Sequence, residues 1–173
     1  MFQDIKNPEE LYNFIRSNIN YGFVSNENII YIRDKVNEEI YMNDIIEKYY
    51  LQSPMELLKS KCGICYDQVE LANLWFIMHG YQVLNCFTNY HNHAMVLYLK
   101  NNKYYWLETT LINHMGIHEY NSLEDFYKDL LIVQKKEIIE LYYFKKVKYG
   151  CGFNTYIDNI VNNNQKILIR KSC

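Results

Sequence analysis

The chain has 173 residues and a net charge of −2, from 18 basic and 20 acidic side chains. A chain of this length is expected to form one domain with a single core. Its 49 % hydrophobic and 22 % charged residues exclude a disordered chain. No basic stripe stands out, so nothing in the charge pattern favours a nucleic-acid partner.

The first ten residues, MFQDIKNPEE, lack the apolar stretch of a signal peptide, and no apolar run approaches the roughly 20 residues of a membrane span. The five cysteines are an odd number without a paired spacing. This pattern fits a reducing compartment better than a disulfide scaffold. We therefore expect a cytoplasmic protein without a membrane partner; the sequence does not indicate its oligomeric state.

The amino-terminal part of the chain is predicted to be helical. Asn7 as the N-cap and Pro8 in the first turn begin a helix whose apolar residues follow helical spacing. Residues 27–51 have the pattern of one or two further helices. Ser53, with Glu56 three positions later, has the pattern of a capping box and predicts another helix start.

After the sequence KCGI, the pattern predicts a central helix and then mainly strands. Residues 65–79 have apolar side chains at intervals of three and four, and Gly80 is a natural helix terminator, so a central helix is predicted. The remaining predicted elements are strands at 81–87, 93–99 and 103–110, with a tight Asn101–Asn102 hairpin between the last two, a helix at 121–136 capped by Ser122, and strands at 138–147 and 166–170. Helices precede strands, which is typical of an α+β fold.

The sequence KCGICYDQ places Cys62 and Cys65 in a C-x-x-C pair, which admits three interpretations. A thioredoxin-like redox pair needs a preceding strand and a later cis-proline loop, but here a helix precedes and both prolines lie upstream. A zinc site would add His91 and His93, which share one face of a strand, although a second C-x-x-C is missing.

In the third interpretation Cys65 is a nucleophile. At the first turn of the central helix, the helix dipole and free N–H groups favour a thiolate. A thiolate needs a histidine partner, and that partner needs an orienting group. His93 begins one predicted strand and Glu108 lies in the next, so the hairpin brings them close together. The sequence thus predicts a Cys–His–acid triad at a helix–sheet junction. Cys62 is then a bystander, or a thiol that pairs with Cys65 under oxidation.

Three segments in order, GICYDQ, HAMV and WLETT, resemble the signature blocks of the transglutaminase-like superfamily. This superfamily has a papain-like core and includes transglutaminases, peptide N-glycanases and many bacterial cysteine proteases or amide hydrolases. The resemblance covers residues 60–112. Three features depart from the family pattern: Glu108 stands where Asp is usual, Met95 replaces a Trp, and the gap between Cys65 and His93 is short.

The resemblance implies a single domain over 1–173, in which a helical flank (1–60) and a last helix and strands (119–173) surround a core at 61–112. That core is a central helix packed on an antiparallel sheet. Cys65 matches the nucleophile, His93 the base and Glu108 the orienting acid. The Cys65 backbone N–H is expected to stabilise the oxyanion, and Gln52 is a second candidate by analogy with papain-like enzymes.

The implied chemistry is acyl transfer on peptide, protein or small amide substrates, without a metal or cofactor. Hydrolysis is favoured over transglutamination, because most small bacterial relatives lack the accessory domains of cross-linking enzymes. A binding or scaffold domain of the same fold remains an alternative.

Overall fold

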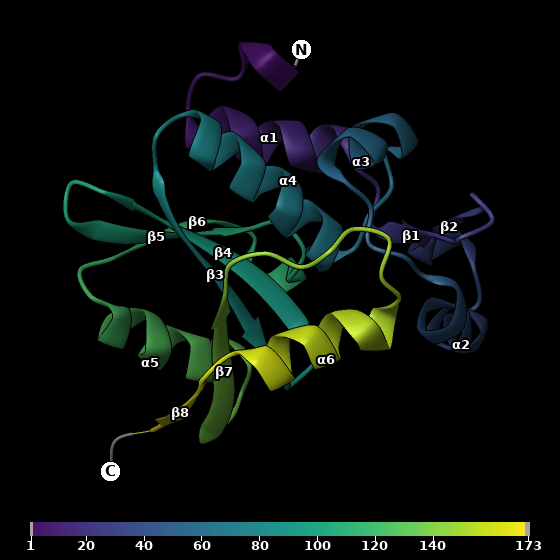
Figure 1. Ribbon diagram of the computed structural model, residues 1–173. Coiled ribbons are helices and arrows are strands. Elements are labelled where there is room, and N and C mark those ends of the chain that lie inside the picture. The colour runs from purple at the N-terminus through teal and green to yellow at the C-terminus, as the bar shows by residue number, and fades with distance from the viewer. Residues whose placement is uncertain (1, 172–173) are drawn as a thin grey trace.

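The computed structural model describes residues 2–171 and has a six-stranded antiparallel sheet in the order β6-β5-β4-β3-β7-β8 (Figure 1). Its strands are β3 (Gln82–Thr88), β4 (His93–Lys100), β5 (Lys103–Glu108), β6 (Gly116–Tyr120), β7 (Ile138–Phe144) and β8 (Lys166–Arg170). A separate two-stranded sheet pairs β1 (Gly22–Val24) with β2 (Ile30–Ile32). The helices are α1 (Pro8–Asn18), α2 (Glu38–Lys48), α3 (Pro54–Ser60), α4 (Cys65–Met78), α5 (Leu123–Val133) and α6 (Phe153–Asn163). The predicted α+β class is therefore confirmed.

The two faces of the sheet pack against different helices. Helices α1, α3 and α4 lie on one side of the sheet and α5 lies on the other (Figure 1). Side chains alternate between the two faces, as the period of a strand requires. Along β4, Ala94, Val96 and Tyr98 join the core on the α4 side, whereas Met95 and Leu97 join the core on the α5 side.

Helix α4 is the central element of the fold. Its residues Cys65–Ala72 are all buried, as are Trp75 and Phe76 farther along. A helix that is buried on every side must be covered by other elements all round, and α4 contacts β3, β4 and α3. Gly80, at φ +76°, follows the helix in the left-handed conformation expected of a terminator.

The start of α3 confirms the predicted capping box. The backbone N–H of Glu56 donates to Ser53 Oγ at 3.4 Å, and the backbone N–H of Ser53 donates to Glu56 Oε2 at 2.7 Å. The helix ends at Lys61, whose φ of 54° turns the chain sharply toward α4. The capping box at the start of α3 and the sharp turn at Lys61 therefore determine the short connection that precedes Cys65.

The prediction of helix throughout residues 27–51 is wrong in its first part. Residues 30–32 form β2, a 3-10 turn follows at Arg33–Lys35, and the helix α2 begins only at Glu38. The physical reason is a tertiary contact, because the Tyr31 ring stacks on Phe23 of β1 at 4.5 Å between centroids. Within residues 2–171, no helix has both the length and the apolar character needed to cross a bilayer.

Candidate active site

Cys65 is the first residue of α4 and follows the N-cap residue Ile64. Its side chain is buried, with 6 % of the residue exposed. The N–H groups of a first helical turn have no carbonyl acceptor within the helix, and the dipole is positive at this end. Reactive cysteines in proteins are commonly found at such helix starts.

The segment before Cys65 is fixed by backbone contacts. The N–H of Gly63 donates to the Asn20 carbonyl at 3.1 Å, and the N–H of Asn20 donates to the Lys61 carbonyl at 2.8 Å. A Cβ at position 63 would lie 2.6 Å from Leu57 Cδ1 and 2.8 Å from Asp67 Cβ. Glycine is favoured there, because an added Cβ would require both the Leu57 side chain and the Cβ of Asp67 to shift.

Asp67 is the buried carboxyl group of this helix start. It accepts hydrogen bonds from the backbone N–H groups of Gln52 and Ile64, each at 3.0 Å, and from the Tyr49 hydroxyl at 3.2 Å. Burial raises the pKa of Asp67 to about 7, although these donors act in the opposite direction. Its carboxyl group therefore holds residue 52 and the N-cap, and only part of the population is charged at neutral pH.

His93 and Glu108 meet across the β4–β5 hairpin. Leu107 pairs with Val96, so the same register carries Glu108 to a position diagonal to His93. The His93 Nε2 atom lies 2.8 Å from Glu108 Oε2, and both side chains are buried, at 6 % and 3 % exposure. The proximity predicted from the hairpin is thus present.

The second oxygen of Glu108 is held by the turn that follows β5. Glu108 Oε1 accepts from the Thr110 N–H at 2.7 Å, the Thr110 hydroxyl at 3.0 Å and the Leu111 N–H at 3.0 Å. Burial by itself raises the pKa of Glu108, but the His93 charge and these donors outweigh it and lower the pKa below its ordinary value. Glu108 is therefore an ionised carboxylate facing His93.

The pKa of His93 is shifted in the opposite direction to that of Glu108. Burial lowers its pKa, but the charge of Glu108 and hydrogen bonding to Cys65 and Glu108 raise the pKa to about 10. The imidazolium is then the favoured form at neutral pH. A positively charged His93 beside Cys65 is the arrangement that favours a thiolate.

A cavity of about 410 Å³ lies over Cys65 and His93. It is lined by Tyr21, Arg33, Tyr41, Met42, Ile45, Ile64, Cys65, Tyr66, His91, Asn92, His93, Thr110, Leu111 and Phe153. Sequence reasoning missed the contribution of Tyr21, Arg33 and Tyr41 to this cavity. Of these, Arg33 lies in the part of residues 27–51 where the prediction of helix is wrong. Thr110 carried a signal, since it belongs to the segment WLETT that pointed to Glu108.

Cys62 is not among the residues that line this cavity. Its Sγ lies 3.9 Å from the carbonyl oxygens of Phe23 and Tyr31. Burial raises the pKa of Cys62 to about 12, and the charge of Asp67 adds to this effect. The four ligands of the alternative zinc site are not assembled, because residues 2–171 contain no group of three or more His, Cys, Asp or Glu side chains able to hold a metal ion.

The side chain of Gln52 is engaged inside the fold. Its Nε2 donates to the Cys62 carbonyl at 2.8 Å, and its Oε1 accepts from the Ser60 hydroxyl at 2.7 Å. Gln52 is 1 % exposed and is not among the residues that line the cavity. In this arrangement its amide holds the segment before α4.

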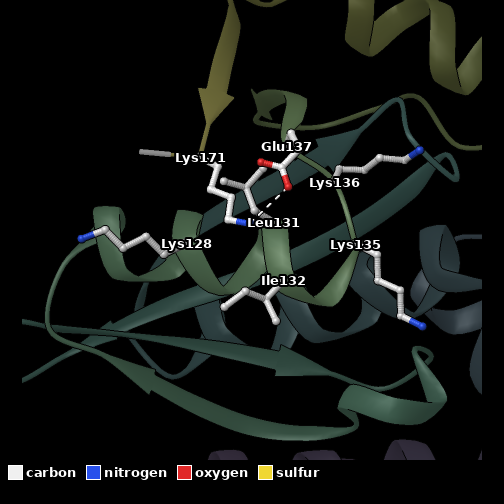
Figure 2. Close-up of a pocket in the computed structure, with 7 residues that line it drawn as sticks. All are labelled: Lys128, Leu131, Ile132, Lys135, Lys136, Glu137 and Lys171. Carbon is white, nitrogen blue, oxygen red and sulfur yellow. Dashed lines mark hydrogen bonds and ion pairs between the residues drawn. The ribbon is translucent and has the colours of Figure 1, made fainter. Parts of the chain in front are cut away.

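A second hollow, of about 450 Å³, lies by the end of α5, the start of β7 and the end of β8 (Figure 2). Its lining residues are Lys128, Leu131, Ile132, Lys135, Lys136, Glu137 and Lys171. Lys171 pairs with Glu137, while Lys128, Lys135 and Lys136 point away from one another (Figure 2). No cysteine or histidine lines this hollow, and its ammonium groups do not converge on a common point, so the cavity over Cys65 is the better candidate site.

No model of a known protein family matches this sequence, and no curated protein matches it either. A function is therefore inferred from the three sequence segments and from the geometry of Cys65, His93 and Glu108.

Proposed function

We propose that the protein catalyses acyl transfer from amide bonds through Cys65, His93 and Glu108, most simply as a cysteine protease or amidase. One observation carries the proposal. His93, which lies 2.8 Å from the buried Glu108 carboxylate, lines the same cavity as Cys65 at the start of α4. A nucleophile, a base and an orienting acid are the groups that this chemistry needs.

In the proposed reaction the Cys65 thiolate attacks the carbonyl carbon of the amide and forms a C–S bond. The Cys65 backbone N–H donates to the oxyanion. The His93 imidazolium gives its proton to the leaving amine as the C–N bond breaks. Neutral His93 then removes a proton from water, which attacks the thioester and releases a carboxylic acid and the Cys65 thiolate. Gln52 is given no part in these steps, because its amide is engaged with Cys62.

We further propose that the α+β fold is a papain-like core of the transglutaminase-like type. Supporting this, the cysteine begins a buried helix, and the histidine and acid lie on adjacent strands of the sheet against which that helix packs. The chain order of cysteine, histidine and acid agrees with the resemblance. The four described cysteines are free thiols, which supports a reducing, cytoplasmic environment.

The first test is alkylation of the folded protein with limiting iodoacetamide at mildly acidic pH, with mass spectrometry to identify the labelled cysteine. We expect fast labelling of Cys65, because a thiolate paired with an imidazolium stays reactive where an ordinary thiol, with a pKa of about 8.5, does not. Cys62, Cys86 and Cys151 serve as internal references, since burial raises the pKa of each. Loss of labelling in His93→Ala completes the expected result, and slow labelling of Cys65 in the wild type would contradict the proposal.

Turnover is the second test. A library of peptide and small-molecule amides identifies a cleaved substrate, with which variants are compared. Cys65→Ala is expected to reduce kcat by several orders of magnitude, while Cys62→Ala, which removes a thiol outside the cavity, keeps turnover near the wild-type value. Unchanged turnover in Cys65→Ala would rule out Cys65 as the nucleophile.

A further inference from the structure

The cavity over Cys65 has the positively charged Arg33 in its wall. No aspartate or glutamate is among its lining residues. Apolar side chains form another part of the wall, namely Met42, Ile45, Ile64, Leu111 and Phe153. A ligand that suits this cavity therefore combines a negative group with an apolar portion.

Arg33 is positioned by its own backbone. It begins the 3-10 turn Arg33–Lys35 directly after β2, and its N–H donates to the Tyr21 carbonyl at 3.1 Å. Its guanidinium carbon lies 5.8 Å from the centre of the Tyr21 ring, and that ring lines the same cavity. The side chain therefore starts from a fixed point beside the cavity wall.

The guanidinium is only lightly engaged by the protein. Its one ion pair within residues 2–171, with Glu38, is 3.3 Å long, and the two side chains are 47 % and 79 % exposed. Exposed pairs of this kind contribute little stability and exchange readily. Because a guanidinium carries five N–H donors, most of the hydrogen-bonding capacity of Arg33 is open to an incoming carboxylate, which it can bind through two parallel hydrogen bonds.

Arg33 and Cys65 both affect the pKa of Tyr21 and the pKa of Tyr41. The pKa of Tyr21 is raised well above its ordinary value by burial and by Cys65, while Arg33 opposes the rise. Burial likewise raises the pKa of Tyr41, with the same opposing effects of Cys65 and Arg33. The positive group and the reactive sulfur are therefore within electrostatic range of the same part of the cavity.

We propose that the site takes amide substrates with a carboxylate close to the scissile carbonyl, and that Arg33 binds this carboxylate. The inference rests on the proposed function, since it assigns a substrate class to the same nucleophile. The apolar wall contacts the uncharged portion of the substrate. Arg33 is then the residue that determines specificity, and it takes no part in bond making or breaking.

The test compares two alkylating probes of similar size, iodoacetate and iodoacetamide, which differ in charge. In both reactions the Cys65 thiolate forms a C–S bond and iodide leaves. The measured quantity is the rate with iodoacetate divided by the rate with iodoacetamide, at Cys65. Arg33→Gln is expected to lower this ratio about fivefold, as loss of a part-exposed ion pair does, and Arg33→Glu is expected to lower it further.

Lys35→Gln is the matched control. Lys35 is exposed, lies on the same 3-10 turn and does not line the cavity, so its removal is expected to leave the ratio within about twofold of wild type. Arg33→Lys keeps the charge without the planar fork and is expected to give a ratio between those of wild type and Arg33→Gln. The iodoacetamide rate in each variant shows whether the site is still folded.

Failure of the inference and failure of the proposed function give different results. If iodoacetamide labels Cys65 selectively in every variant while the ratio stays constant, Arg33 does not bind the anion and the proposed function is unaffected. An equal fall in Lys35→Gln would mean a general effect of net charge and would also overturn the inference. If neither probe labels Cys65 selectively in the wild type, the proposed function and the inference both fail.

Discussion

At the scale of single residues, the two oxygens of Glu108 have separate tasks. Oε2 faces His93, while Oε1 accepts from the Thr110 N–H, the Thr110 hydroxyl and the Leu111 N–H. The turn after β5 is therefore built around this carboxylate. These donors fix the oxygen of Glu108 that is farther from His93.

Glu108→Gln tests this arrangement. It removes the negative charge that raises the pKa of His93. The His93 imidazolium then loses its proton at lower pH, and the proposed Cys65 thiolate loses its positively charged partner. We expect iodoacetamide labelling of Cys65 near pH 6 to slow at least about tenfold, with the pH profile moving toward that of an ordinary thiol. The measurement is the labelling rate from pH 5 to 9.

The matched control is Glu119→Gln, which removes an exposed carboxylate from β6. Its pH profile is expected to coincide with that of the wild type. A Glu108→Gln profile that also coincided with wild type would show that His93 does not need its carboxylate partner.

At the scale of elements, the short segment between α3 and α4 determines where Cys65 lies. Lys61 turns the chain, Gly63 fits between Leu57 and Asp67, and Asp67 holds the N–H of Ile64. The packing at Gly63 joins α3 to α4, so the position of the nucleophile depends on how closely these two helices pack. A change of a few tenths of an ångström there would move Cys65 relative to His93.

Gly63→Ala introduces such a change. Its Cβ would approach Leu57 Cδ1 to 2.6 Å and Asp67 Cβ to 2.8 Å, and overpacking of this kind typically costs about 1–3 kcal/mol. We expect a lower free energy of unfolding in urea and slower labelling of Cys65. Gly152→Ala is the control, because a Cβ there meets only the Tyr49 carbonyl oxygen at 3.6 Å and the loss at a helix N-cap is expected to stay below about 1 kcal/mol. Equal unfolding free energies for the two variants would contradict the close packing at Gly63.

The helices and strands also differ in how well the sequence can predict them. Helices α1, α3 and α5 begin at cap residues and the β4–β5 hairpin turns at Asn101–Asn102, so local signals sufficed for them. No element was predicted where β6 and α6 lie. Strand β6 has the unremarkable sequence GIHEY and depends on pairing with β5, and α6 starts at Gly152 without a side-chain cap.

The candidate site also has one part that the sequence could predict and one part that it could not. The proximity of His93 and Glu108 follows from hairpin register and was predictable, whereas their catalytic roles stay predictions. The wall formed by Tyr21, Arg33 and Tyr41 was not predictable. Those residues reach the cavity through pairing of β1 with β2 and packing of α2, which are contacts between segments far from Cys65 in the chain.

At the scale of the whole molecule, burial of α4 between the sheet and the other helices places two carboxyl groups in an apolar core. Asp67 and Glu70 are 0 % and 1 % exposed. Burial raises the pKa of each to about 7, from 3.8 for Asp67 and 4.5 for Glu70. Both groups therefore bind a proton more tightly in the folded chain than in the unfolded one.

This difference sets the sign of the pH dependence. Where the folded state binds more protons than the unfolded state, the free energy of unfolding falls as pH rises. For Asp67 and Glu70 that window runs from about pH 4 to about pH 7. His93, with its pKa raised from 6.5 to about 10, adds stability below pH 6.5 that is lost as pH rises toward 10. Glu108, with a lowered pKa, acts in the opposite direction but only below about pH 4.5.

We therefore expect the free energy of unfolding in urea to decrease between pH 5 and pH 7, and Glu70→Gln to flatten that decrease by about 2–3 kcal/mol. The slope is the informative quantity, because the Glu70 Oε1 atom has no hydrogen-bond partner among the described residues and an amide there changes stability at every pH. Glu39→Gln, in the exposed first turn of α2, is expected to keep the wild-type slope. A Glu70→Gln slope equal to that of Glu39→Gln would mean that Glu70 ionises as easily in the folded chain as in the unfolded one, and that the core around α4 is open to water.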